Sequence, residues 1–298
     1  MNSQRLAIQL MIFQAVLFAA ETAIIHHIGS RVSLLQLALI RGSAGVALAL
    51  VLGRNIGLAV IHTRQLILQL VRGGISLVYL WVMIYSFSHL PFADATAISY
   101  THAAYIAVFS VLILRESVSW SRWAAAAVGI VGALLIAKPA FAGWNSIYLI
   151  ALIGTSLNGL AFVLNKYLQQ EDTAITTMFY TNMVLLLSNA PAIAMGPWPS
   201  PDMLPWLCGF FILGPIGMYV GIVAVKHASA SVLGPYTLLR LVIGVLGGVA
   251  IFHEFPDVFS AFGIVLILAS CVLSSRIITR QPLLANRAGG RRASGAPA

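Results

Sequence analysis

Long uninterrupted runs of apolar residues constrain this sequence more than any other feature. Ten such runs follow one another along the chain, each close to the ~20 residues that a helix needs to cross about 30 Å of hydrocarbon. They cover residues 6–29, 34–53, 66–87, 92–114, 120–137, 146–168, 174–195, 203–225, 229–252 and 258–275. Charged residues make up only 8% of the chain, against about 25% in soluble domains. The sequence therefore predicts an all-α integral membrane protein with ten transmembrane helices.

The stretch from His89 to Pro139 is repeated 138 positions further along the chain. With this offset, His227 aligns with His89, Glu254 with Glu116, Gly263 with Ala125, Ser270 with Gly132 and Arg240 with His102. Five spans per half is an odd number, so the two halves cross the membrane in opposite senses. We therefore predict two inverted five-helix repeats, residues 6–138 and 145–277, followed by a disordered cytoplasmic tail at residues 278–298.

The distribution of Lys and Arg predicts the orientation of the chain. With the N-terminus in the cytoplasm, 12 of the 17 Lys and Arg residues fall in cytoplasmic segments, and two, Arg31 and Lys138, fall in external ones. The positive-inside rule then puts both termini in the cytoplasm, with the chain in the plasma (inner) membrane. The net charge of +9 does not indicate nucleic-acid binding, because the cations lie at helix ends and in the tail. Cys208 and Cys271 are isolated within spans, so neither a metal site nor a cofactor is expected.

Each half of the chain ends in a Glu-containing turn followed by a helix rich in small residues. Together with Arg41 in the second span and Pro235 in the ninth, this order resembles the ten-helix drug/metabolite transporter superfamily, EamA type, over about residues 6–277. The resemblance implies bidirectional or export-directed movement of small metabolites through a cavity between the halves, without nucleotide hydrolysis. The chain departs from the pattern at Ala97, which stands where the ninth span has Pro235. It also carries His102 and Arg240 at paired positions, which are not hallmarks of the superfamily.

Four charged residues lie inside the predicted spans: Glu21, Arg41, Arg72 and Arg240. A charge at the centre of a membrane helix costs roughly 2.5–3.5 kcal/mol, so such residues are paired or face a wet cavity. Glu21 and Arg41 are expected at similar depths, which leaves two alternatives for Glu21: an ion pair with Arg41, or a cavity position that binds an amine or a proton. Arg72 lies near the start of its span, and we expect it to reach the interface.

Arg240 lies at the centre of the ninth span, too deep to reach the interface, and follows Pro235 by five residues. Because a proline breaks the helical hydrogen bonding, we predict a kinked, cavity-lining segment in which Arg240 binds substrate. His102 is its repeat partner and a second candidate. Aromatic residues on these two predicted helices and on the one at 66–87 are candidates for a wall that contacts an apolar part of the substrate, with ordinary packing as the alternative: Tyr79, Trp81, Tyr100 and Tyr236.

These features favour a secondary transporter of small organic metabolites over an enzyme or a non-transporting scaffold. Arginine can form a bidentate contact with a carboxylate, and Glu21 could bind an amine. Amino acids, including aromatic and apolar ones, are therefore the preferred substrates. Cationic drugs and nucleoside-type molecules are the alternative cargo. No phosphate-binding Gly-Lys motif is present, which gives ATP-driven transport no support. The sequence leaves open the direction of flux, proton-coupled or facilitated movement, and whether the chain forms a homodimer.

Overall fold

Apolar length and helix-breaking residues together set the helix boundaries of this protein. The computed structural model describes residues 3–28, 31–54, 57–90, 98–116, 118–137, 146–194, 198–252 and 257–276, and every regular element within them is helical. The α-helices are α1 (Ser3–Ile28), α2 (Leu34–Leu52), α3 (Leu66–His89), α5 (His102–Leu112), α6 (Trp120–Ala137), α7 (Ser146–Leu168), α8 (Ala174–Ser188), α9 (Leu204–His227), α10 (Ala230–Leu233), α11 (Leu239–Phe252) and α12 (Val258–Arg276). The 3-10 segments are η1 (Gly57–Val60), η2 (Ala190–Ala194), η3 (Pro201–Met203) and η4 (Gly234–Leu238).

Within the described residues, six helices are long and apolar enough to cross a membrane by length and composition, and four more apolar helices are shorter. Their outward faces carry large aliphatic side chains, of which Ile67 is 80% exposed and Val258 82% exposed. Side chains of this kind are solvated by lipid tails at no cost, whereas water would disfavour so large an apolar surface. The predicted all-helical membrane architecture agrees with this surface.

Most predicted spans coincide with helices, and proline-containing segments account for one difference and one predicted break. The predicted helix at 174–195 is wrong at its end: α8 stops at Ser188, where Asn189 donates its side-chain amide to the Leu185 carbonyl at 2.8 Å, and Pro191 follows in η2. The predicted break at Pro235 is confirmed, because α10, η4 and α11 replace one continuous helix. Ala97, Glu254 and the predicted tail at 278–298 lie outside the described residues.

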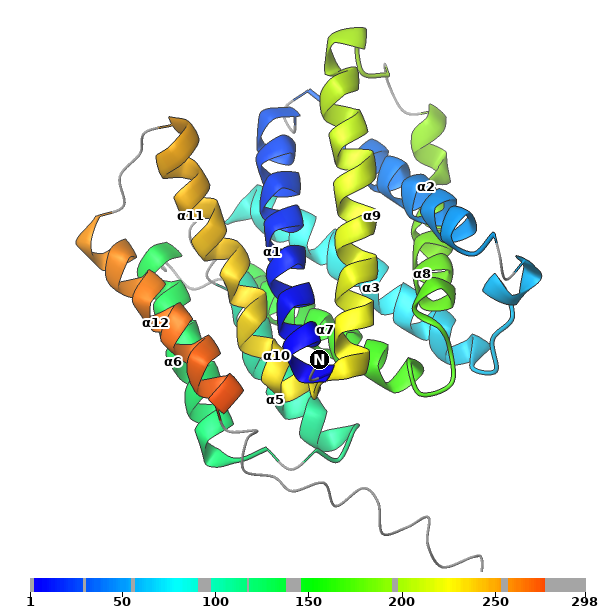
Figure 1. Ribbon diagram of the computed structural model, residues 1–298. Helices are drawn as coiled ribbons and strands as arrows, with labels where there is room; N and C mark the ends of the chain where they lie inside the picture. Colours follow the sequence, from blue (N-terminus) through cyan, green and yellow to red (C-terminus); the bar gives the residue numbers. More distant parts are fainter. Residues whose placement is uncertain are drawn as a thin grey trace, which may run out of the picture.

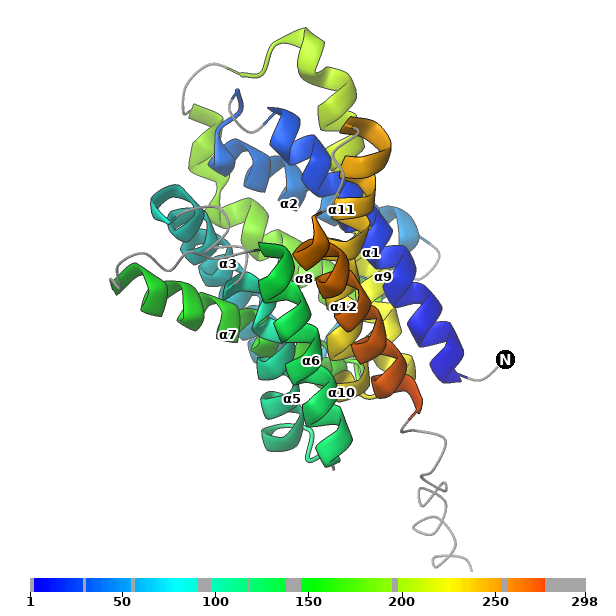
Figure 2. The same ribbon diagram turned by 90° about the vertical axis from the view of Figure 1, so that its left-hand side faces the viewer.

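The helices pack in pairs, which Figures 1 and 2 show from two sides. Helix α1 lies along α9, α2 along α8, α3 along α7, and α6 along α12. The α6–α12 pair is a backbone-to-backbone crossing: a Cβ added at Gly132 would lie 2.7 Å from the carbonyl oxygen of Gly263, and one added at Gly263 would lie 2.6 Å from that of Gly132. Small residues at such crossings let membrane helices approach closely.

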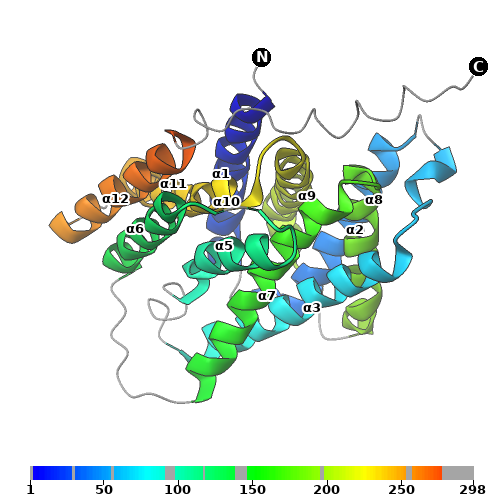
Figure 3. The same ribbon diagram turned by 90° about the horizontal axis from the view of Figure 1, so that it is seen from below.

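Helices α10 and α11 lead away from one end of the molecule. The N-terminus of α1, the end of α9 and all of α10 lie together at the lower end of Figure 1, and α11 runs from there toward the opposite end. Viewed from below in Figure 3, α10 and α11 lie between the α6–α12 pair and the long helices α1 and α9. This arrangement places the start of α11 beside α1, with which it is in contact.

Candidate functional site

A buried ion pair joins α1 to α2. Glu21 is only 2% exposed, and its Oε1 accepts a hydrogen bond from Nη1 of Arg41. Helix α9 makes room for the pair at Gly214, because a Cβ there would lie 2.4 Å from Glu21 Oε1. The ion pair, one of the two alternatives that the sequence leaves open for Glu21, is therefore present. A buried carboxylate needs such a partner, since an isolated charge is strongly disfavoured away from water.

Phe18 connects this ion pair to Arg240. The guanidinium carbons of Arg41 and Arg240 each lie 5.7 Å from the centroid of the Phe18 ring, within the distance at which a cation interacts with an aromatic face. The ring occupies space that Gly217 of α9 leaves free, since a Cβ there would lie 2.7 Å from Phe18 Cε1. Sequence reasoning missed Phe18. Its spacing of three residues from Glu21 places both on one face of α1 and would have been the signal.

Arg240 lies at the start of α11, directly after the η4 segment that contains Pro235. Its side chain is partly exposed, and its charge interacts electrostatically with Tyr79, Tyr100 and His102. Helices α3, α5 and α11, together with the turn before α5, therefore bring a guanidinium and three ring side chains into one neighbourhood. We call the whole group the central cluster: Phe18, Glu21, Arg41, Tyr79, Tyr100, His102 and Arg240.

His102 begins α5 and is held by a backbone contact. Its Nδ1 lies 2.8 Å from the carbonyl oxygen of Ser99, and the ring centroid lies 6.4 Å from that of Tyr100. A carbonyl oxygen only accepts hydrogen bonds, so this contact places the ring proton on Nδ1. In the neutral imidazole, Nε2 is then an acceptor and can take a hydrogen bond from an N–H group.

Two of the predicted site residues lie apart from this neighbourhood. Tyr236 is 5% exposed in η4, and its hydroxyl donates to the carbonyl of Cys271 in α12 at 3.1 Å. It packs in the same apolar cluster against which Tyr100 lies. Trp81 is 45% exposed on α3. The structure therefore gathers Glu21, Tyr79, Tyr100, His102 and Arg240, but it puts Tyr236 into the packing of η4 against α12 and Trp81 on the surface.

Arg72 is buried, and the expectation that its side chain reaches the interface is wrong. Only 5% of the residue is exposed, and its Nη1 donates to the Thr181 hydroxyl of α8. One turn earlier on α3, Gln69 donates to Asp172 at 2.8 Å and to Thr177 at 3.1 Å. Helix α8 therefore offers hydroxyl groups along the face where α3 is polar, which keeps the Arg72 side chain inside. These bonds join α3 to α8 and lie outside the central cluster.

Comparisons with known proteins extend these observations. The EamA-like transporter family matches residues 5–138 and again residues 145–276. A solved crystal structure superposes with a TM-score of 0.79 at 19% identity, covering 92% of this chain and 98% of the other, which shows the fold alone.

The curated relatives are transporters by name. An S-adenosylmethionine uptake transporter of Rickettsia bellii is 30% identical over 62% of this chain, but the match spans only 64% of that protein. One of Rickettsia conorii is 25% identical over 84% of this chain and 85% of its own length. The pseudopaline exporter CntI of Pseudomonas aeruginosa is 24% identical over 90% of this chain and 95% of its own.

The family match covers nearly all of the described chain, and family and relatives alike are transporters rather than enzymes. The apolar helices and the lipid-compatible surface fit the same class. The chain accordingly belongs to the EamA-like transporter family and is a multi-pass integral membrane protein.

Proposed function

We propose that this protein is a secondary transporter that moves amino acids and amino-acid-like metabolites by alternating access, with export as the favoured direction. The observation that carries the proposal is the position of Arg240, a partly exposed arginine that interacts electrostatically with Tyr79, Tyr100 and His102. Glu21 and Arg41 form an ion pair, and Arg240 brings a further positive charge to the central cluster. A site of this charge favours a substrate with an anionic group.

The carboxylate of the substrate binds Arg240. A guanidinium remains protonated at physiological pH, and its planar fork matches the two oxygens of a carboxylate. Hydrogen bonds that involve a charged group contribute about 1.5–3 kcal/mol each. Such a contact inside an apolar protein therefore has enough energy to select acids over their amides.

The ammonium group of the substrate has two acceptors within the central cluster. Glu21 uses Oε1 for Arg41, and its second oxygen can still accept, because a carboxylate has several lone-pair sites. His102 offers Nε2 when Nδ1 carries the proton. Tyr79 and Tyr100 then line the side chain of the substrate, which favours aromatic and apolar amino acids. We propose that Trp81 and Tyr236 join this wall when α3 and the α10–α11 segment move during the transport cycle.

The named substrates of the relatives are compatible with this class. S-adenosylmethionine, the compound in the names of the Rickettsia proteins, contains an α-amino-acid group. The Pseudomonas relative is named as an exporter, so related proteins are named for both directions of movement. Export by this chain remains our proposal, as does the amino-acid substrate.

The packing of the helices supports two inverted repeats. If residues 6–138 and 145–277 are equivalent, α1 corresponds to α7 and α9 to α3, so the α1–α9 pair has its counterpart in α7–α3. The α2–α8 and α6–α12 pairs then each join two equivalent helices. Inversion requires α5 and α11, which hold matching positions, to cross the membrane in opposite directions.

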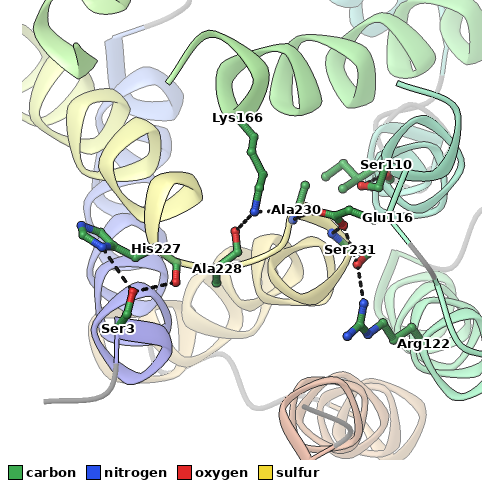
Figure 4. Close-up of polar contacts among 10 residues, drawn as sticks. Ser3, Ser110, Glu116, Arg122, Lys166, His227, Ala228, Ala230 and Ser231 are labelled. Atoms are coloured by element: carbon green, nitrogen blue, oxygen red, sulfur yellow. Dashed lines mark hydrogen bonds and ion pairs between the residues drawn. The ribbon is translucent and has the colours of Figure 1, made fainter. Parts of the chain in front are cut away.

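The arrangement of the termini and turns supports the orientation predicted from Lys and Arg. Ser3 at the start of α1 donates to the His227 carbonyl at the end of α9 at 3.0 Å, and Lys166 and Glu116 lie at the same end of the molecule (Figure 4). The positive-inside count assigns these segments to one side. We propose that this end is cytoplasmic, in the inner membrane.

Replacing Arg240 with Gln tests the substrate assignment. We expect R240Q to weaken transport of an amino acid such as phenylalanine by about 10- to 150-fold, the loss of one charge-assisted contact, while transport of phenylalaninamide changes little. The measurement is uptake of each radiolabelled compound into proteoliposomes. Arg31→Gln is the matched control, because Arg31 is exposed and pairs loosely with Asp202 at 3.8 Å. An equal loss for acid and amide in R240Q would exclude a carboxylate contact at Arg240.

A further inference from the structure

The turn between α5 and α6 reaches across to the second half of the chain. Helix α5 ends at Leu112, and Arg115 adopts the left-handed conformation with φ 52°, which is uncommon for a residue other than glycine. The backbone N–H of Glu116 donates to the carbonyl of Ser110 at 3.1 Å, which folds the turn back onto α5. The Glu116 side chain points from this turn toward α10 (Figure 4).

The Glu116 carboxylate caps the start of α10. It accepts hydrogen bonds from the backbone N–H of Ala230 at 3.2 Å, from the backbone N–H of Ser231 at 3.3 Å, and from the Ser231 hydroxyl at 2.9 Å. Arg122 of α6 also donates to the Ser231 hydroxyl, at 3.1 Å. The first N–H groups of a helix have no partner within the helix, and they favour an anion. A carboxylate of the first half thus satisfies the helix start of the second half.

Lys166 of α7 strengthens the same contact. Its Nζ lies 3.5 Å from Glu116 Oε1 and donates to the carbonyl of Ala228, between α9 and α10. An apolar layer lies next to this polar group, since Ile106, Val163 and Ala230 pack together and are each 0% exposed. We call the polar group the Glu116 latch: Glu116, Arg122, Lys166, Ser231 and the backbone of residues 228–231.

The Arg240 face of α11 is uncovered beyond Arg240, at two glycines in the middle of the helix. Gly244 and Gly247 follow Arg240 by four and seven residues, so all three share one face of α11. A Cβ added at Gly244 or Gly247 would meet no atom within 4 Å. The apolar layer and the Glu116 latch lie at the α10 end of this segment, whereas the described residues leave Gly244 and Gly247 uncovered on the Arg240 face of α11.

We propose that the Glu116 latch is the closed gate of the transport path, and that substrate reaches Arg240 in this state from the opposite end along the glycine face of α11. The proposal rests on the alternating-access function proposed above. Opening the path at the latch requires the α5–α6 turn to move away from α10. This movement breaks the hydrogen bonds that the Glu116 carboxylate accepts from Ala230 and Ser231. The latch therefore favours the conformation described here, and weakening it shifts the population toward the conformation that is open on the latch side.

Thiol labelling from each side of the membrane tests the gate. Two reporters are placed in a cysteine-free background in which Cys208 and Cys271 are replaced by Ser: S110C, which is isosteric and directly under the latch, and G244C, on the open face of α11. Both are treated with a membrane-impermeant maleimide in right-side-out and in inverted vesicles. In the parent background we expect the thiol of G244C to react only from the side opposite Glu116, and the thiol of S110C to react from neither side.

Adding Glu116→Gln keeps the shape of the side chain and removes its charge. We expect the labelling of S110C from the latch side to become about tenfold faster, the effect of losing one charge-assisted hydrogen bond. The labelling of G244C from the other side should slow in the same variant. Asp202→Asn, an exposed carboxylate change at a distant ion pair, should alter neither rate. If E116Q folds poorly, Lys166→Met leaves the cap intact and should shift both rates in the same directions by a smaller factor.

The paired rates separate a gate from a purely structural contact. Local unfolding of E116Q would expose the thiol of S110C without protecting that of G244C, and this result would overturn the proposal, as would unchanged rates in both variants. Labelling of G244C from the Glu116 side in the parent would also overturn it. The assay needs no substrate. Failure of amino-acid transport with reciprocal labelling intact would contradict the substrate assignment alone.

Discussion

At the scale of single residues, Phe18 shows what the sequence could and could not reveal about the site. A charged residue in an apolar run is conspicuous, so Glu21, Arg41 and Arg240 could all be selected from their positions alone. A phenylalanine in a membrane helix is ordinary, and only its spacing of three residues from Glu21 hints that Phe18 differs from lipid-facing residues such as Phe13. Only tertiary packing shows that two guanidinium groups flank its ring.

Phe18→Leu should raise the KM for amino-acid transport more than it lowers the maximal rate. Leucine fills much of the same volume but has no aromatic face, and a cation–aromatic contact contributes about 0.5–2 kcal/mol, or about two- to thirtyfold in affinity. Phe18→Tyr keeps the ring and should retain a KM close to that of the parent. Concentration-dependent uptake into proteoliposomes measures both parameters. A similar KM for the Leu and Tyr variants would mean that the ring does not position Arg240.

At the scale of helices, the apolar pattern predicted the bounds of α6 and α7 correctly, because those helices consist of one continuous apolar run. The prediction was wrong for the end of α8, where Asn189 caps the helix seven residues early and the apolar run continues in 3-10 form. The role of Glu116 was also hidden. The repeat marks it as a turn residue, but its contact with the start of α10 depends on how the two halves pack.

The close packing of α1 against α9 lets us predict how one added methyl group changes the stability of the protein. Gly214→Ala places a Cβ 2.4 Å from Glu21 Oε1, so the buried ion pair or α9 must shift, at a cost of about 1–3 kcal/mol. Gly74→Ala on α3 is the matched control, because a Cβ there meets nothing within 4 Å, and Gly to Ala at a compatible site stabilises by about 0.4–1 kcal/mol. Thermal unfolding in detergent should therefore show G214A below the parent and G74A at or above it. Equal stability of the two variants would contradict the tight fit described around Glu21.

At the scale of the whole molecule, the central cluster and the Glu116 latch lie at different levels of the proposed transport path. The central cluster joins α1, α2, α3 and α11 with the segment that begins α5, and the latch joins the α5–α6 turn, α6, α7 and α10. The α10–η4–α11 segment connects the two levels, since it carries Ser231 at one end and Arg240 beyond the break at Pro235. Movement of this one segment can therefore couple substrate binding to the opening of the gate.

The central claim is that the transporter recognises the carboxylate of an amino acid. The most direct measurement is counterflow with the unmodified protein: proteoliposomes loaded with unlabelled phenylalanine are exposed to radiolabelled phenylalanine or radiolabelled phenylalaninamide. The two compounds share the amine and the ring and differ in the group that would meet Arg240. We predict exchange of the acid and at least about tenfold slower exchange of the amide, as expected from one charge-assisted contact. Equal exchange of acid and amide would contradict the account.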